Sequence, residues 1–199
     1  MNIIISLLVI FGGLGFTAII ELYEYLIGKR RKISVNSKFS TLITLLLLGV
    51  GTFLFFILEY RYTGELTDGS VQQRLLVSFF HSASLRTAGF STVSLAGISG
   101  ATALLCMLLM FIGASPNSTG SGIKTTTFGI LYLGVRTSLL NKRYIEYSKR
   151  RISWQLFNKA STLVFIASSY IMIMAILMMY FDKDKEPIKV LFELMSAFS

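Results

Sequence analysis

Residues Phe79 to Phe90, with the sequence FFHSASLRTAGF, lie between two long apolar segments but are too polar and too few to cross a bilayer. The helix-compatible run Val71 to Ser84 leads into them, and Gly89 stands where the backbone has to leave helical geometry. Non-helical backbone at membrane depth is stable only where it lines a water-filled path or is buried in protein. A half-helix followed by a short extended Thr-Ala-Gly segment directs carbonyl oxygens at a dehydrated cation. We therefore predict a re-entrant pore loop.

The composition is that of an integral membrane protein. Of the 199 residues, 53% are hydrophobic and only 15% are charged, and the mean hydropathy is +0.67. A soluble domain carries about 25% charged residues. A single cysteine and a single histidine cannot form an intrachain disulfide or a Cys/His metal site. The sequence therefore predicts no bound cofactor.

The net charge of +9 is concentrated in two short loops. These loops hold eleven of the 19 basic residues, namely Lys29, Arg30, Arg31, Lys32, Lys38, Lys142, Arg143, Lys149, Arg150, Arg151 and Lys159. Loops rich in Lys and Arg mark the cytoplasmic side of a membrane protein and set its orientation. Nucleic-acid binding would need a basic face without hydrophobic spans on either side, so we expect no nucleic-acid partner.

The first apolar segment, Asn2 to Ile27, is long enough to cross a hydrocarbon core of about 30 Å. It lacks a basic n-region and a small-residue cleavage site, so it is predicted to be a spanning helix rather than a signal peptide. Its motif Gly12-Gly13-Leu14-Gly15-Phe16 has two interpretations. One is close helix packing through small residues, and the other is a flexible point beside a pore.

Two further spans are predicted at Thr41 to Leu58 and at Ala160 to Phe181. Between them, the apolar region Ile98 to Leu140 is roughly twice as long as one span requires. A polar interruption divides it, formed by Gly113, Ala114, Ser115, Pro116, Asn117, Ser118, Thr119, Gly120, Ser121, Gly122, Ile123 and Lys124. A proline with several glycines and hydroxyl residues cannot continue a helix. We predict a broken helix, with one part ending at Ile112 and the other beginning near Thr125.

The second basic loop, Asn141 to Lys159, contains Trp154 as an interfacial anchor. This loop has two interpretations: it is a docking surface for a cytoplasmic partner, or its basic residues attract anionic membrane lipid. The sequence leaves both interpretations open.

Pro187 opens a short helix, Ile188 to Ser199, whose end resembles the start of the pore loop at Phe79. The run Leu7 to Gly13 similarly resembles Leu108 to Ala114. These echoes predict an all-α integral membrane protein built from repeated helix–pore-loop–helix units. Residues 1–28 would close one repeat, 41–140 would form a complete repeat, and 160–199 would open the next. Residues 29–40 and 141–159 would be cytoplasmic loops, and the chain is expected to be a piece of a larger protein.

Two long motifs resemble the TrkH/KtrB family of bacterial potassium transporters, and the run GIKTTTF at Gly122 to Phe128 is most similar to the KtrB branch. The motifs are Arg86 to Phe90 (RTAGF) and Met110 to Phe128. GGLGF at Gly12 to Phe16 and FELMSAFS at Phe192 to Ser199 also resemble that family, in matching order.

The resemblance implies a potassium channel-like subunit of four repeats around one pore. Carbonyls near Thr87, Ala88 and Gly89 would form the selectivity filter for K+, with Arg86 and Phe90 bracing it. Gly113 to Lys124 would be the intramembrane gate loop, although Asn117 and Ser121 stand where the family usually has glycines. The family also implies a homodimer in the bacterial plasma (inner) membrane. Its partner would be a cytoplasmic nucleotide-binding regulatory ring subunit of the KtrA/TrkA kind.

Rival functions are less well supported. A phosphate-binding loop needs Gly-Lys-Ser/Thr in succession, but Ile123 separates Gly122 from Lys124. His81 and Ser82 suggest a hydrolase, but the sequence offers no set of histidine, carboxylate and nucleophile for one. We therefore expect that this protein is not an enzyme. A non-conducting structural membrane subunit, or a truncated relic of a transporter, remains the alternative.

Overall fold

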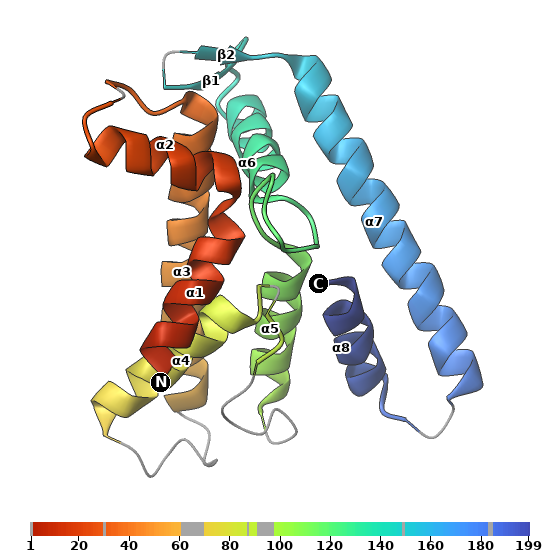
Figure 1. Ribbon diagram of the computed structural model, residues 1–199. Helices are drawn as coiled ribbons and strands as arrows, with labels where there is room; N and C mark the ends of the chain where they lie inside the picture. Colours follow the sequence, from red (N-terminus) through yellow and green to blue (C-terminus); the bar gives the residue numbers. More distant parts are fainter. Residues whose placement is uncertain are drawn as a thin grey trace.

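The computed structural model describes residues 2–29, 31–60, 70–86, 88–90, 98–148, 150–182 and 185–199 (Figure 1). Its elements in chain order are α1 (Asn2–Leu14), α2 (Phe16–Leu26), α3 (Val35–Tyr60), α4 (Val71–Ser84), α5 (Gly100–Phe111), α6 (Thr125–Leu139), β1 (Ile145–Tyr147), β2 (Arg150–Ile152), α7 (Trp154–Phe181) and α8 (Pro187–Phe198). The helical fold predicted from the sequence is confirmed. The short antiparallel hairpin β1–β2 was not predicted.

Two helices, α3 and α7, are long and apolar enough to cross a membrane. Both begin earlier than their apolar runs predict, at Val35 rather than Thr41 and at Trp154 rather than Ala160. In each case a serine precedes the helix and its hydroxyl accepts a hydrogen bond from a backbone N–H of the first turn. The Ser37 N–H donates to Ser34, and the Leu156 N–H donates to Ser153. Such caps satisfy the free N–H groups of a first turn. The two basic loops are therefore shorter than predicted.

The first apolar segment is not the single straight spanning helix that its length predicts. The axes of α1 and α2 differ by 103°, and Gly15 between them has φ +85°. A Cβ atom on Gly15 would lie 2.4 Å from the carbonyl oxygen of Pro116. The chain turns here because a glycine permits both this backbone conformation and this close approach. The motif Gly12 to Phe16 thus serves close packing, and its packing partner is the interruption of the broken helix.

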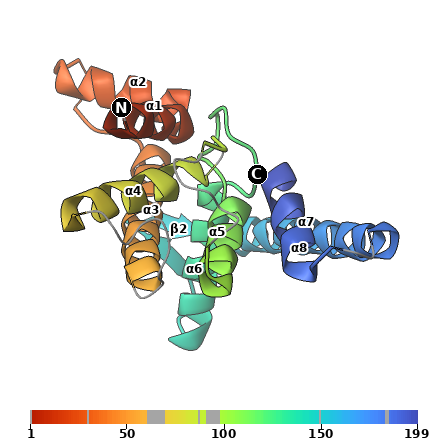
Figure 2. The same ribbon diagram turned by 90° about the horizontal axis from the view of Figure 1, so that it is seen from below.

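Helices α4 and α8 begin at the same end of the molecule, and α4 stops partway along it beside α5 (Figure 1). Seen from below, they lie on opposite sides of α5 (Figure 2). Helix α4 packs against α1 and α3, whereas α8 packs against α5 and α7. This is the arrangement predicted for two half-helices of successive pore loops.

Two apolar clusters hold these helices together. One joins α3, α4 and α5 through Phe55, Leu85, Cys106, Leu109 and Met110. The other joins α3 to α6 through Phe39, Ile43 and Leu47, against which Tyr147 of the hairpin also packs. Large apolar side chains on α7, such as Phe165 and Ile176, are exposed. Lipid chains solvate such a surface, as expected for an integral membrane protein.

Candidate functional site: a pore-loop segment and an intramembrane loop

The pore-loop helix α4 has a defined start and a defined end. Ser70 and Gln73 form a reciprocal capping box at its first turn. At the other end the Ser84 carbonyl accepts the N–H groups of Ala88 at 2.9 Å and Gly89 at 3.2 Å. Gly89 has φ +68°, a conformation that L side chains rarely adopt. The glycine therefore lets the chain leave helical geometry at the position that the sequence predicts.

Ser84 holds both ends of the segment 88–90. Its carbonyl accepts the two N–H groups above, and its hydroxyl donates to the Phe90 carbonyl. Phe90 is 60% exposed. The hydrogen bond from Ser84 therefore holds the backbone of Phe90, whereas its ring is largely uncovered by the described residues. Thr87, the first residue of the predicted filter, lies outside the described residues.

A cavity of about 180 Å³ lies against this segment. Its walls come from the segment 88–90, from the C-terminal ends of α4 and α8, and from Met110 of α5. None of the residues that line it has a charged side chain. The C-terminal end of a helix carries a partial negative charge of about half an elementary charge. The end of α4 that meets this cavity makes it favourable for a cation.

The predicted intramembrane loop, Gly113 to Lys124, is closed at its base. Ile112 and Ile123 form a parallel bridge, and the Ile123 N–H donates to the Phe111 carbonyl at 3.1 Å. A Cβ atom on Gly113 would lie 1.8 Å from the Ser121 carbonyl oxygen. The two legs of the loop are thus in backbone contact. Helix α5 ends at Phe111, one residue before the predicted Ile112, and α6 begins at Thr125 as predicted.

Arg86 lies between this loop, α3 and the segment 88–90. Its Nη2 donates to the Gly113 carbonyl at 3.2 Å and its Nη1 to the Thr44 carbonyl at 3.3 Å. The side chain is 7% exposed. Arg86 thus contacts the intramembrane loop and α3 directly.

Four buried hydroxyl groups surround the first leg of the loop. Ser115 Oγ accepts from Ser40 Oγ at 2.6 Å and lies 3.3 Å from Thr44 Oγ1 and 3.2 Å from Thr125 Oγ1. We call these four residues the hydroxyl cluster. Because buried hydroxyls in an apolar setting need partners, this cluster fixes Ser115 against α3. The sequence analysis missed Ser40 and Thr44, although their i, i+4 spacing on an apolar span is a signal that could have identified them.

The tip of the loop contacts the turn between α1 and α2. The Phe16 N–H donates to the Asn117 carbonyl at 3.0 Å, and Thr119 Oγ1 lies 3.5 Å from the Gly12 carbonyl. Asn117 itself has φ +57°. Asparagine tolerates this left-handed conformation better than most residues, so it can occupy a position where the resembling family usually has glycine.

Lys124, the only charged residue in the loop, directs its Nζ at the Gly120 carbonyl, 2.7 Å away. It also stands at the N-terminal end of α6, where the helix dipole disfavours a positive charge. A lysine held there places a positive charge at the second leg of the loop.

Substitution of Gly15 should destabilise the protein through its contact with the loop. Gly15→Ala would force φ +85° on an L residue and push against Pro116. Gly28 has φ +77° but nothing within 4 Å of an added Cβ, so Gly28→Ala is a matched control for the backbone conformation alone. Forcing a residue into a rarely populated backbone region costs about 1–3 kcal/mol. Thermal unfolding of the full-length protein should therefore show a clearly larger loss of stability for Gly15→Ala than for Gly28→Ala. Equal losses of stability would mean that the contact with Pro116 contributes nothing.

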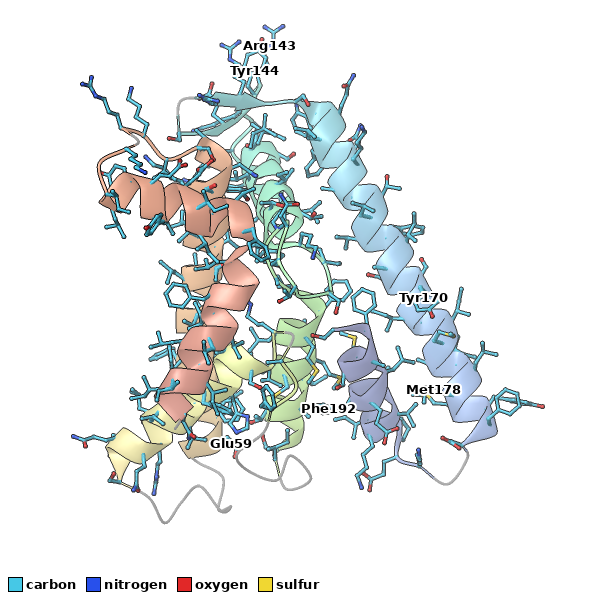
Figure 3. The ribbon with its side chains drawn as sticks, in the orientation of Figure 1. Glu59, Arg143, Tyr144, Tyr170, Met178 and Phe192 are labelled. Atoms are coloured by element: carbon cyan, nitrogen blue, oxygen red, sulfur yellow. The ribbon has the colours of Figure 1, made fainter. Side chains whose placement is uncertain are left out.

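The hairpin β1–β2 lies within the second basic loop and forms a separate surface. Ile145 is fully buried and the Tyr147 ring packs 4.5 Å from that of Phe39, so the hairpin is anchored to α3. Burial also raises the pKa of Tyr147. The guanidinium carbons of Arg151 and Arg143 lie 4.2 and 5.6 Å from the centre of the Tyr144 ring. Figure 3 shows Arg143 and Tyr144 pointing away from the helices.

Among the described residues, no group of three or more His, Cys, Asp or Glu side chains could hold a metal ion. The polar groups of the segment 88–90 and of the hydroxyl cluster are carbonyl and hydroxyl oxygens, and oxygen ligands suit hard cations.

The comparisons with known proteins agree with this geometry. A family model for TrkH, described as a cation transport protein, matches residues 1–199. The chain is 36% identical over 195 residues to the Ktr system potassium uptake protein B of Vibrio alginolyticus, which covers 96% of this chain and 42% of that protein. It is 33% identical over 199 residues to the protein of the same name from Bacillus subtilis (strain 168), covering 100% of this chain and 44% of that protein.

A third relative is the potassium/sodium uptake protein NtpJ of Enterococcus hirae, 36% identical over 166 residues, covering 83% of this chain and 36% of that protein. The crystal structure of the potassium transporter TrkH from Vibrio parahaemolyticus matches the fold with a TM-score of 0.71 at 18% identity, over 90% of this chain and 39% of that one. The chain thus spans less than half of the length of these relatives. All of them are transport proteins, which agrees with the expectation that the chain is not an enzyme.

Proposed function

The chain belongs to the TrkH family of cation transport proteins, and from this premise we propose that it is part of the membrane subunit of a potassium uptake system. K+ passes a filter of backbone carbonyls at Thr87, Ala88 and Gly89. The loop Gly113 to Lys124 gates the pore beneath that filter. The chain holds no cofactor of its own, and K+ is its cargo.

The observation that carries this proposal is the cavity between the segment 88–90 and the ends of α4 and α8. The half-helix α4 directs its C-terminal, negative end at this space, and Gly89 turns the backbone there with φ +68°. Carbonyl oxygens and helix ends replace the hydration shell of a cation without a charged side chain. Such an arrangement favours passage of the ion over tight binding.

The loop suits a gate for two reasons. Its first leg is fixed by Arg86 and the hydroxyl cluster, whereas its tip is held by two contacts with the α1–α2 turn. Its one charged group, Lys124, is a cation that opposes the passage of K+ when it faces the pore. A displacement of the tip would move a barrier without disturbing the filter.

Uptake of Rb+ tests the proposal. The full-length protein should restore growth at low K+ to a bacterial strain that lacks its own K+ uptake, and should transport Rb+ in competition with K+. Because one relative carries the name of a potassium/sodium uptake protein, competition by Na+ is measured in the same assay. A full-length protein that reaches the membrane but transports neither ion would support the structural subunit instead.

We place the full-length protein in the bacterial plasma (inner) membrane as a multi-pass homodimer, in contact with membrane lipid. Two relatives are named as components of a Ktr system, which supports a partner protein. The partner that we propose is a cytoplasmic nucleotide-binding regulatory ring subunit. The surface of Arg143, Tyr144 and Arg151 fits such a partner, because tyrosine and arginine are enriched at the centres of protein interfaces.

Charge reversal on the hairpin should weaken binding of this ring subunit. With Arg143→Glu and Arg151→Glu, the affinity of the full-length protein in zwitterionic nanodiscs should fall at least about tenfold, or 1.4 kcal/mol. Lys189→Glu, at the opposite end of the molecule, is the control and should change nothing. If the double variant binds the ring normally but no longer binds anionic lipid vesicles, the hairpin is a lipid-binding surface instead.

A further inference from the structure

Arg86 is a buried cation whose contacts are carbonyl groups. Its two Nη atoms donate to Gly113 and Thr44, and its Nε has no hydrogen-bond partner among the described residues. No acidic side chain forms an ion pair with it in the part of the chain that the structure describes. A buried charge without a counter-ion is costly to the fold. Packing alone would be served better by an apolar side chain, so the guanidinium points to a positioning role.

The two acceptors of Arg86 belong to segments that are otherwise far apart in the sequence. Gly113 is the first residue of the intramembrane loop, and its backbone touches the second leg at Ser121. Thr44 lies in the middle of α3, and its hydroxyl contacts Ser115 at 3.3 Å. Arg86 therefore holds Gly113, and Thr44 holds Ser115, two residues further along the first leg. We call residues 113–115 the root of the loop.

The root and the tip of the loop are attached to different parts of the molecule. The root is joined to the end of α4 by Arg86 and to α3 by the hydroxyl cluster. The tip is joined to the α1–α2 turn through Asn117 and Thr119. Any displacement of the segment that follows Arg86 is thus transmitted to the root, while the tip remains free to follow the α1–α2 turn.

We propose that Arg86 couples the selectivity filter to the gate by fixing the position of the loop root relative to the filter. This inference rests on the proposed function, because it assumes that the loop is a gate. Its consequence is that the filter and the closed position of the loop are maintained by the same guanidinium. Loss of the two-carbonyl bridge should both loosen the filter and let the gate leak.

Arg86→Lys is the most informative change at this position. Lysine keeps the positive charge but presents a single ammonium group instead of a planar fork, so it cannot bridge both carbonyls in the same way. Arg136→Lys, on the exposed face of α6, is the matched control for the chemical change itself. Both are made in the full-length protein, reconstituted in liposomes, with Rb+ flux and K+/Na+ preference as readouts.

The test is a double-mutant cycle with a loop shortened by deletion of Asn117 to Thr119. If Arg86 holds the root, Arg86→Lys raises the flux roughly tenfold with the intact loop and leaves it unchanged with the shortened loop, because neighbouring groups in one network are not additive. The K+/Na+ preference falls in both backgrounds. If Arg86→Lys instead lowers the flux by the same factor in both backgrounds, Arg86 supports only the filter and the coupling is refuted.

The cycle separates this inference from the proposed gate. A shortened loop that does not raise the flux by itself contradicts the gate, whatever Arg86 does. Should Arg86→Lys fail to accumulate in the membrane, Arg86→Gln carries the same test, because a single side-chain amide cannot bridge the Gly113 and Thr44 carbonyls as the planar guanidinium does. A rise in flux that disappears in the shortened loop supports the coupling, and an equal effect in both backgrounds overturns it.

Discussion

Replacement of Gly89 by serine should lower the preference of the full-length protein for K+ over Na+ by about tenfold. Gly89 has φ +68°, which an L residue adopts at a cost of about 1–3 kcal/mol. The segment would relieve this strain by rotating its backbone, and the carbonyl oxygens would move with it. Na+ and K+ differ in how well a given set of carbonyls replaces their hydration shells, so a rotated segment discriminates less between them. Initial rates of K+ and Na+ uptake, measured separately in liposomes, give the ratio directly.

Gly28→Ser is a closely matched control for Gly89→Ser. Gly28 has φ +77°, and among the described residues neither glycine has an atom within 4 Å of an added Cβ. The two changes therefore impose similar backbone strain, but Gly28 follows α2 and is distant in sequence from the pore loop. We expect Gly28→Ser to cost stability without altering the ion preference. An unchanged preference in Gly89→Ser would exclude a carbonyl filter at this position.

The sequence predicted the pore loop and the broken helix well because both depend on local chemistry. A run of helix-compatible residues forms α4 and is followed by Gly89, and proline with glycines separates α5 from α6. These residues act on the backbone of their own segment. Their effects can therefore be predicted without knowing which helices are neighbours. The end of α4 and the break between α5 and α6 could be predicted to within one residue for the same reason.

The features that the sequence did not predict depend on contacts between distant segments. The 103° turn at Gly15 arises because the intramembrane loop occupies the space in front of it. The hydroxyl cluster joins Ser40 and Thr44 to Ser115, and no local pattern pairs these residues. Arg86 was expected to brace the pore loop, but its contact with Gly113 could be found only in three dimensions. The roles of Thr87, Ala88 and Gly89 in ion binding stay predictions.

Deletion of Asn117 to Thr119 should raise the rate of ion flux while leaving the K+/Na+ preference unchanged. The Ala114 N–H and the Ser121 carbonyl are already 3.4 Å apart, so the two legs can be joined by a short turn. After the deletion this turn reads Ser115-Pro116-Gly120-Ser121, and proline followed by glycine at its centre favours a type II turn. The deletion removes the tip and its contacts with the α1–α2 turn. It retains the root, Arg86 and the hydroxyl cluster.

The filter should be unaffected by this deletion because each contact that holds the segment 88–90 lies outside the deleted residues. If the tip adds about 1.4 kcal/mol to the energy barrier for ion passage, its removal raises the flux about tenfold. Ser118→Ala is the control, since it loses only the local bond from Ser118 Oγ to the Ser115 carbonyl and keeps the loop length. A lower or unchanged flux in the deletion would show that the loop is a structural support. A higher flux with a lost ion preference would show that the tip also shapes the filter, which the separation of their contacts argues against.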